Sequence, residues 1–176
     1  MINSQDWIFQ QYVKELASKK RRLLSTKQKN MLQIKVKKLH KNAVIPTYAK
    51  AGDAGMDLTA TEIESTANYI AYKTGLAFEI PEGYVGLLFP RSSNSKKQLL
   101  LTNSVGVLDS GYRGEVEFRF KIVGNGAMPA DFPDAYHLGD KVGQLVVIPY
   151  PSINFTEVDE LSSSERGEGG FGSSGN

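Results

Sequence analysis

The sequence predicts an all-β domain, a distorted jelly roll closed as a barrel-like fold or a sandwich, with an extra N-terminal helix and a flexible C-terminal arm. Three observations predict this. Apolar and polar residues alternate with a period of two from Leu32 onward, as in half-buried strands. Turn signals rich in Gly, Pro and Asp interrupt the alternation at short intervals. No strong helical pattern occurs between Met31 and the C-terminus.

The composition is that of a globular protein. The 176 residues suffice for one domain with a proper core, and 40% of them are hydrophobic and 23% charged. No apolar run approaches the roughly 18 residues of a membrane span, so no membrane insertion is expected. The chain has no cysteine, which excludes disulfides, thiolate metal sites and cysteine nucleophiles. The first residues lack the order of a secretory signal, so a cytoplasmic protein is expected.

The first thirty residues differ from the rest. Residues 5–24 carry apolar side chains at helical spacing, among them Ile8, Tyr12 and Leu16, and end in a basic run, which predicts a short amphipathic helix. Residues 1–30 hold seven Lys or Arg and two acidic side chains, a net charge of +5. Binding to nucleic acid would have to rest on this segment alone, and a solvated helix without that role is the alternative.

Six strands follow from the pattern. Strict alternation predicts strands at 32–36, 76–80 and 116–122, and shorter β-rich runs predict three more at 84–89, 99–102 and 144–149. Turn signals separate them, including Pro81-Glu82-Gly83, Asp109-Ser110-Gly111 and Leu138-Gly139-Asp140. Residues 124–137 contain two prolines and two glycines and are expected to form a long exposed loop.

The C-terminal end is a separate segment. Residues 166–175 contain five glycines and too little apolar surface to become ordered alone. The chain is therefore expected to comprise a basic helical extension and linker at 1–30, a β-domain at 31–164 and a glycine-rich arm at 165–176.

Four segments combine turn glycines with side chains suited to phosphate: 51–58, 90–93, 106–114 and 166–175. Glycine lets backbone amides approach an anion, arginine offers a planar fork to phosphate oxygens, and serine adds a hydroxyl donor. Each segment alone is consistent with an ordinary turn. The absence of a Walker A sequence excludes a P-loop protein.

In order and spacing these segments resemble the five motifs of the homotrimeric dUTPases, which run here through 51–58, 90–97, 103–114, 139–146 and 166–175. The resemblance covers residues 32–175. It implies the dUTPase fold, hydrolysis of dUTP to dUMP and pyrophosphate with Mg2+, and a homotrimer whose active sites are shared between subunits. Such an enzyme limits uracil incorporation into DNA and supplies dUMP for dTMP synthesis.

The resemblance implies that Asp109 is the general base, which orients and deprotonates the water that attacks the α-phosphate. A positioned carboxylate can do this without a covalent intermediate. Alone, an aspartate in Asp-Ser-Gly would be interpreted as a turn residue. Its place within the whole set of motifs favours catalysis.

The same motif is implied to recognise the nucleoside. Tyr112 matches the residue whose ring packs on the deoxyribose and leaves no room for a 2′-hydroxyl. Asn103, with the hairpin backbone at Gly106 and Val107, matches the region that reads uracil, since backbone donors and acceptors can imitate a base-pairing edge. A tyrosine packed at a hairpin and an ordinary turn asparagine are the alternatives.

Three motifs are implied to hold the triphosphate and the metal. Arg91, Ser92 and Ser93 match the second motif, with Ser92 donating near the bridging oxygen that leaves with pyrophosphate. Gln144 matches the glutamine near the α-phosphate or a metal-bound water. Asp57 is expected to contact Mg2+ through water, because Mg2+ keeps several waters and binds through substrate phosphates. The alternatives are a structural salt bridge for Arg91, a strand-end carboxylate for Asp57 and a sheet-capping amide for Gln144.

The arm is implied to close over the bound nucleotide. Phe171 would stack on uracil, and Arg166 with Gly172, Ser173 and Ser174 would hold the β- and γ-phosphates. Such an arm can be disordered without substrate and ordered with it.

Three positions depart from the family pattern: Ser93 replaces a common glycine, Lys141 a usual arginine and Ser174 a frequent threonine. Lys141 lacks the bidentate fork of arginine, so an interface ion pair there would have a different geometry. The nearest rival, dCTP deaminase, shares the fold and trimer but needs a glutamate to activate water at the base. His40 and His137 lack metal-ligand spacing and are expected in surface or loop positions.

Overall fold

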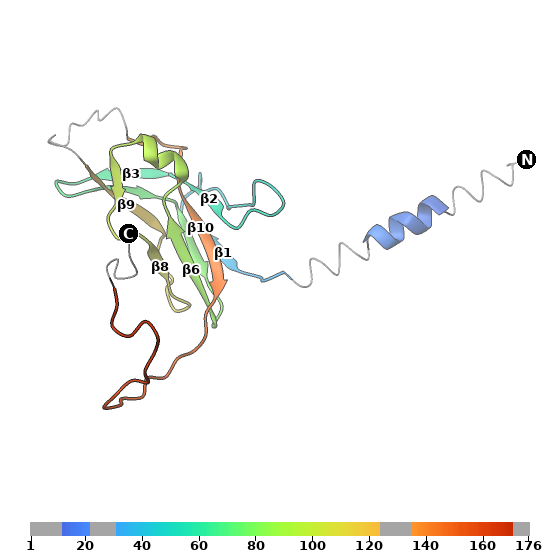
Figure 1. Ribbon diagram of the computed structural model, residues 1–176. Helices are drawn as coiled ribbons and strands as arrows, with labels where there is room; N and C mark the ends of the chain where they lie inside the picture. Colours follow the sequence, from blue (N-terminus) through green and yellow to red (C-terminus); the bar gives the residue numbers. More distant parts are fainter. Residues whose placement is uncertain (1–11, 22–30, 124–134, 171–176) are drawn as a thin grey trace, which may run out of the picture.

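The computed structural model describes residues 12–21, 31–123 and 135–170. In this part of the chain ten strands and one short 3-10 helix form the β-domain (Figure 1). In chain order the elements are β1 Lys35–Lys38, β2 Met56–Thr59, β3 Glu62–Ser65, β4 Ile70–Lys73, β5 Leu76–Glu79, β6 Tyr84–Phe89, η1 Ser92–Lys96, β7 Leu99–Leu101, β8 Gly106–Leu108, β9 Glu117–Ile122 and β10 Lys141–Pro149.

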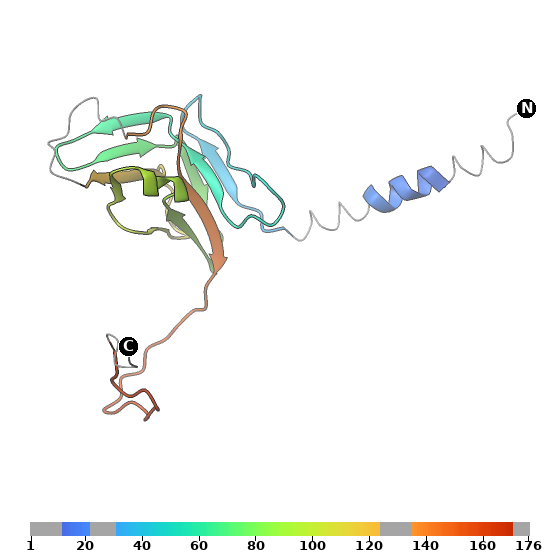
Figure 2. The same ribbon diagram turned by 45° about the horizontal axis from the view of Figure 1, so that its top comes forward.

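The described strands form three antiparallel sheets. One has the order β2-β10-β6-β8, a second has the order β3-β4-β9-β7, and β1 pairs with β5. The two four-stranded sheets face each other across one core, as Figures 1 and 2 show from two directions. Apart from the hairpin of β3 and β4, the neighbours in these two sheets are distant in sequence, as in a jelly roll. The jelly-roll prediction is confirmed in its sandwich form, since no sheet of the described strands closes into a barrel.

Both four-stranded sheets contribute to the core. Its largest fully buried apolar side chains are Tyr72, Phe118, Phe120, Leu58, Leu76, Leu145, Val116 and Val142. The predicted alternation is plain on β9, where Phe118 and Phe120 are buried and Arg119 and Lys121 are exposed. Burial of each large apolar side chain contributes about 1.5–3 kcal/mol, so this alternation fixes which face of β9 meets the other sheet.

Most predicted strands are confirmed. The strand at 84–89 has the predicted bounds, and those at 76–80, 99–102, 116–122 and 144–149 are found within a few residues. The first strand begins later than predicted, at Lys35, where β1 pairs with β5. The predictions omitted β2, β3, β4 and β8, each three or four residues long.

The predicted exposed loop at 124–137 is wrong at its C-terminal end. Tyr136 is only 5% exposed and packs edge-on against Tyr72, with ring centroids 5.5 Å apart. Its backbone N–H donates to the Tyr72 hydroxyl at 3.1 Å. A single aromatic anchor among prolines and glycines has no periodic signal. The loop residues 124–134 lie outside the described ranges.

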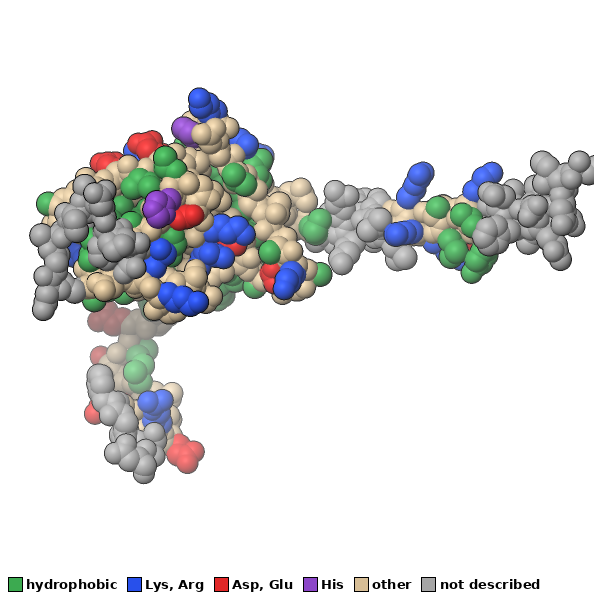
Figure 3. All heavy atoms as spheres, turned by 90° about the horizontal axis from the view of Figure 1, so that it is seen from above, with side chains coloured by type: hydrophobic (Ala, Val, Ile, Leu, Met, Phe, Trp, Pro, Cys, Tyr) green, Lys and Arg blue, Asp and Glu red, His purple; other side chains and the backbone are tan. Residues whose placement is uncertain are grey.

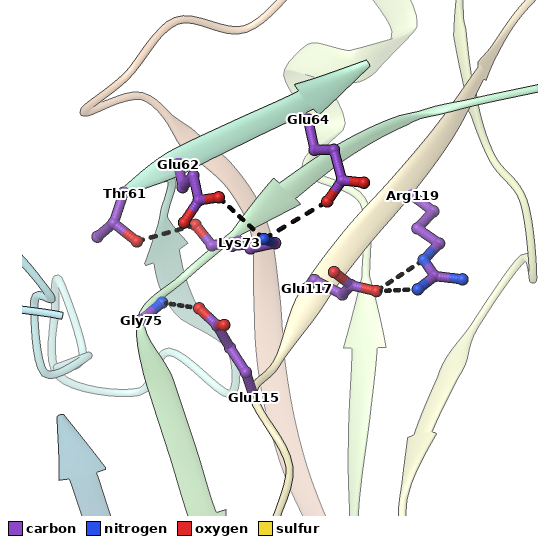
Figure 4. A network of polar contacts seen from close by, with 8 residues as sticks. All are labelled: Thr61, Glu62, Glu64, Lys73, Gly75, Glu115, Glu117 and Arg119. Carbon is purple, nitrogen blue, oxygen red and sulfur yellow. Dashed lines mark hydrogen bonds and ion pairs between the residues drawn. The ribbon is translucent and has the colours of Figure 1, made fainter. Parts of the chain in front are cut away.

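The solvent-facing side of β3, β4 and β9 carries paired charges (Figure 4). Nζ of Lys73 lies 2.9 Å from Glu62 and 3.4 Å from Glu64. Arg119 pairs with Glu117 along β9. Exposed pairs of this kind each contribute little to stability, so they mark a solvated face of the sandwich.

The described residues 12–21 are helical, as predicted for the N-terminal segment, and all ten are exposed. Its apolar side chains Tyr12, Val13 and Leu16 are 44–60% exposed. None of the helical residues within the described ranges forms a segment that is long and apolar enough to cross a membrane.

Candidate active site

A carboxylate shared by two cations lies where β2, β10 and β6 meet. Asp57 on β2 accepts a hydrogen bond from Nε of Arg91 at 2.9 Å, and Nζ of Lys141 on β10 lies 2.9 Å from its other oxygen. Strand pairing explains the meeting, because β10 pairs with β2 on one side and with β6 on the other, and Arg91 follows β6. Three segments far apart in sequence are thus joined at one carboxylate.

The two cations stabilise the negative charge of Asp57. Burial raises the pKa of Asp57, but hydrogen bonds from Lys141 and Arg91 outweigh burial and hold the pKa below its ordinary value of 3.8. Asp57 is therefore ionised at neutral pH. Lys141, considered from the sequence for an ion pair between subunits, forms this ion pair within its own chain.

Gln144 lies opposite Asp57 in the register of β10 with β2. Its side-chain amide donates to the carbonyl of Pro90 at 3.3 Å. Gly55 makes room for it, since a Cβ at that position would overlap Oε1 of Gln144. Together with Asp53, these side chains line a polar cavity of about 310 Å3.

The turn after β6 carries the serines of the second motif. Ser92 is exposed at the start of η1, and its carbonyl accepts a hydrogen bond from Oγ of Ser95 at 2.8 Å. Nη1 of Arg91 reaches Oγ of Ser93 at 3.4 Å. Both motif serines therefore lie in one short turn that directly follows Arg91, the partner of Asp57.

A basic cavity of about 440 Å3 adjoins this turn. Its lining includes Arg91, Lys97, Lys141, Tyr136 and Asp140. Figure 3 shows Lys and Arg side chains gathered on this end of the domain, beside an acidic side chain and a histidine. Converging cations of this kind attract phosphate groups.

The third motif forms a tight turn after β8. The Tyr112 N–H donates to the carbonyl of Asp109 at 3.0 Å, and Nη1 of Arg113 donates to the carbonyl of Ser110 at 2.6 Å. The Asp109 side chain is exposed. The hydroxyl of Tyr112 donates to the carbonyl of Glu115 at 3.0 Å. The turn thus presents a carboxylate to solvent beside a fixed tyrosine ring.

The residues expected to recognise the nucleoside line one small cavity beside this turn. Asn103, Gly106, Val107 and Tyr112 are among the lining residues of this space, whose volume is about 170 Å3. Gly106 is required by close packing, because a Cβ there would lie 3.0 Å from Cβ of Leu88 on the paired strand β6.

The predicted site residues form two groups within the described chain. Asp57, Arg91, Ser93 and Gln144 gather around β2, β10 and the end of β6. The Asp109 turn follows β8, at the other edge of the sheet from β2, and the two groups line separate cavities. In a single copy, Asp109 therefore belongs to a different part of the surface from Asp57.

The arm is described only in part. Nε of Arg166 donates to the carbonyl of Gly169 at 2.8 Å within an exposed turn. The remaining predicted contacts of the arm, Phe171, Gly172, Ser173 and Ser174, lie outside the described residues.

Asp53 and Tyr136 are among the lining residues of these cavities that were absent from the predicted site. Asp53 lines the cavity with Asp57, and its position four residues before Asp57 in the same glycine-rich segment could have suggested it. Its Oδ2 accepts a hydrogen bond from the Lys50 N–H at 2.7 Å. Tyr136 lines the basic cavity, and nothing in the sequence pattern marks it.

The donors around Asp57 suit a hydrated magnesium ion brought by phosphates. In the described part of the chain no group of three or more His, Cys, Asp or Glu side chains could enclose a metal. Mg2+ commonly uses one or two carboxylates and keeps several waters. His137 is exposed, and Nδ1 of His40 accepts a hydrogen bond from the Asn42 N–H at 3.1 Å, so both histidines have the predicted surface or loop positions.

Known proteins are similar over most of the β-domain. The dUTPase family profile matches residues 41–175. A deoxyuridine 5'-triphosphate nucleotidohydrolase of Clostridioides difficile is 40% identical over 148 residues, covering 82% of this chain and 99% of the relative. A variant dUTPase of Staphylococcus bacteriophage 80alpha, solved with dUpNHpp, has a TM-score of 0.70 and 32% identity, covering 83% of this chain and 100% of that one. A dUTPase of phage phi11 of S. aureus, whose structure reveals the coordination of a structural Mg(II) ion, has a TM-score of 0.60 and 30% identity, covering 73% and 98%.

Proposed function

The chain belongs to the dUTPase family, and on this premise we propose that it is a Mg2+-dependent dUTP diphosphatase acting as a homotrimer. The reaction is hydrolysis of dUTP to dUMP and diphosphate. The family match over residues 41–175 includes all five motif segments, which supports this activity. Removing dUTP limits uracil incorporation into DNA and supplies dUMP for dTMP synthesis.

Asp109 is the proposed general base. It holds a water against the α-phosphate and takes its proton while the bond to the bridging oxygen breaks and diphosphate leaves. The exposed carboxylate, on a turn whose backbone is fixed by Tyr112 and Arg113, supports this role. A positioned base contributes about 10²–10⁴-fold to rate.

Arg91, Ser92 and Ser93 are proposed to stabilise the leaving diphosphate. Asp57 accepts the hydrogen bond from Nε of Arg91. The terminal N–H groups of the guanidinium can then donate to phosphate oxygens. Ser92 is exposed at the start of its turn, where its hydroxyl can donate to the bridging oxygen. Donors placed where charge develops lower the barrier most.

Asp57 and Gln144 are proposed to hold waters of a magnesium ion bound to the triphosphate. When bound, Mg2+ neutralises phosphate charge and orients the chain of phosphates. The two cations already on Asp57 favour an outer contact through water over a direct bond to the metal. The amide of Gln144, across the strand pair, offers both a donor and an acceptor to such a water.

The small cavity at the third motif is the proposed nucleoside site. Asn103 and the backbone at Gly106 and Val107 read uracil, and Tyr112 packs on the deoxyribose. The lining of this cavity by Asn103, Gly106, Val107 and Tyr112 supports this assignment.

The arm at 165–176 completes the proposed site by closing over the nucleotide. Phe171 stacks on uracil, and Arg166, Gly172, Ser173 and Ser174 hold the β- and γ-phosphates. Arg166 is exposed on a turn beyond the β-domain, which supports its role in binding phosphate when the arm closes. Residues 31–164 then form the catalytic domain and 1–30 an added extension.

A homotrimer would unite the two groups of site residues. The Asp109 turn and the Asp57 cluster lie at different edges of one sheet. In an oligomer the Asp109 turn of one copy can therefore lie beside the Asp57 cluster of another copy. Closed rotational symmetry makes each such contact recur in every subunit. The free nucleotide substrate is consistent with the expected cytoplasmic location.

The observation that carries the proposal is the joining of three motif segments at Asp57 in a chain of this family. The test is to incubate the protein with dUTP or dCTP, with Mg2+ or with a chelator. Diphosphate from dUTP that requires Mg2+ would support the proposal. Ammonia released from dCTP would establish the rival deaminase activity instead.

The basic extension at 1–30 is a separate question. Deleting it should leave dUTP hydrolysis unchanged, because the family match begins at residue 41. Salt-sensitive DNA binding that disappears with the deletion would establish the nucleic-acid role considered from its charge.

A further inference from the structure

We propose that Tyr136 is a positioning residue, which holds the phosphate-binding turn Ser92–Lys96 in place through a hydrogen bond from its hydroxyl to Asn94. The inference rests on the proposed function, because the geometry of this turn matters to catalysis only if its serines contact the phosphates of dUTP.

The turn has little to hold it by itself. η1 is a five-residue 3-10 helix with no buried residue, no side-chain cap and no acidic residue in its first turn. At its two ends the Asn94 N–H donates to the Arg91 carbonyl and the Lys97 N–H donates to the Asn94 carbonyl, both at 2.9 Å. Short 3-10 turns have poor hydrogen-bond geometry. The one side-chain bond inside the described turn, from Oγ of Ser95 to the Ser92 carbonyl, is exposed, so contacts from outside add to the hold on Ser92.

Asn94 supplies those contacts from the middle of the turn. Its Nδ2 donates to the carbonyl of Leu99 at 2.7 Å, which ties the turn to the start of β7. Its Oδ1 accepts a hydrogen bond from the hydroxyl of Tyr136 at 3.1 Å. Both ends of the amide are thus used, one by the following strand and one by a distant residue.

Tyr136 is itself fixed by the core. Its ring lies edge-on to Tyr72 and 5.8 Å from Phe120, and its N–H donates to the Tyr72 hydroxyl. Burial raises the pKa of Tyr136, so the hydroxyl keeps its proton at neutral pH and remains a donor. The hydroxyl of Tyr136 therefore carries the rigidity of the core to Asn94.

A second contact joins the same segments. Nζ of Lys97, directly after the turn, lies 4.5 Å from the centroid of the Tyr136 ring and donates to the Ala135 carbonyl at 3.2 Å. The ring also lines the basic cavity with Arg91 and Ser93. Residues 135–136 thus hold the turn at its middle and at its end, next to the groups proposed to bind phosphate.

Tyr136→Phe tests this, because it removes the hydroxyl and keeps the ring in the core. Loss of one net hydrogen bond is worth about three- to tenfold. We expect weaker binding of dUpNHpp and a lower kcat/KM for dUTP by that factor, with unchanged affinity for dUMP. The distinction arises because dUMP lacks the β- and γ-phosphates that the turn would contact.

Two further variants keep the test independent of folding defects. In an Asn94→Ala background, adding Tyr136→Phe should change dUpNHpp affinity no further, since the bond is already lost. Tyr69→Phe, at a tyrosine whose ring lies against Arg119, is the matched control and should behave as wild type in every assay.

The outcomes separate the two claims. Suppose that the wild type hydrolyses dUTP and that Tyr136→Phe binds dUpNHpp as tightly as the wild type does. That result would overturn the positioning role and leave the proposed function standing. Equal weakening of dUMP and dUpNHpp would overturn the positioning role as well, because a general structural effect moves both ligands. If the wild type does not hydrolyse dUTP, the proposed function fails and the positioning role fails with it.

Discussion

Asp57 on β2 and Lys141 on β10 form an ion pair across the two strands, with carboxylate oxygen and ammonium nitrogen 2.9 Å apart. Arg91 holds the second oxygen at the same distance. The carboxylate is thereby fixed in direction and charge at the place where the proposed triphosphate and its magnesium ion bind. This clamp, in which Lys141 and Arg91 hold Asp57, makes the stability of the fold depend on pH.

Asp57→Asn should lower thermal stability at pH 7 and should matter less in acid. The folded pKa of Asp57 lies below the ordinary 3.8 because of its two cationic partners. A group with a lowered folded pKa stabilises the fold fully above its unfolded value, and that contribution is lost as pH falls through the folded pKa. The gap in unfolding temperature between wild type and variant, measured by calorimetry, should therefore shrink from pH 7 to below 3.8. A gap that stays constant would contradict the clamp.

Gly55→Ala should impair hydrolysis by displacing a neighbour. A Cβ at position 55 would overlap Oε1 of Gln144 and push the amide out of the cavity it shares with Asp57. We expect a fall in kcat of up to about 10²–10³-fold, the cost of losing one stabilising donor. Steady-state kinetics in a Gln144→Ala background provides the control, since the added Gly55→Ala should then cost nothing further. If Gly55→Ala lowers kcat by the same factor in the Gln144→Ala background as in the wild type, Gly55 does not act through Gln144.

Gly143→Ala should destabilise the sandwich. Gly143 lies at the register shift of β10, and a Cβ there would overlap the ring of Phe118 in the opposite sheet. Overpacking of this kind costs about 1–3 kcal/mol in urea unfolding. Gly111→Ala is the matched control, because a Cβ there meets nothing within 4 Å and stability should not change. Similar unfolding curves for both variants would refute the packing argument.

Tyr112→Ala should relax sugar discrimination. The ring is held over the turn by the bond from its hydroxyl to the Glu115 carbonyl, in the cavity shared with Asn103. Removing the ring opens the space that a 2′-hydroxyl needs. The ratio of kcat/KM for UTP to that for dUTP should rise, and diphosphate release from the two nucleotides measures it. An unchanged ratio would remove Tyr112 from sugar recognition.

The sequence predicted those parts of the fold whose signal is local. β6 was found with its full bounds because a mostly apolar run of six residues stands between a Pro-Glu-Gly turn and Pro90. β8, with three residues, is set by its pairing to β6, which no local window contains. Tyr136 was missed for the same reason, because its burial depends on Tyr72, far away in the sequence.

The candidate site divides in the same way. The identities of Asp57, Arg91 and Gln144 could be predicted from motif order, but the ion pair of Asp57 with Lys141 could not, because it depends on the register of β10 against β2. The separation of the Asp109 turn from these residues also follows from strand order alone. Assembly of the two groups would depend on contacts between copies, which a single sequence does not encode as a pattern.

The central claim is that Asp109 is the base for hydrolysis of dUTP. The most direct test measures diphosphate release from dUTP with Mg2+ for wild type and Asp109→Asn at equal concentrations of folded protein. The exposed turn position of Asp109 predicts that the variant folds as wild type does, as circular dichroism can check. We predict a loss of about 10²–10⁴-fold in kcat, the usual contribution of a positioned base. Equal rates for the two proteins would contradict the account.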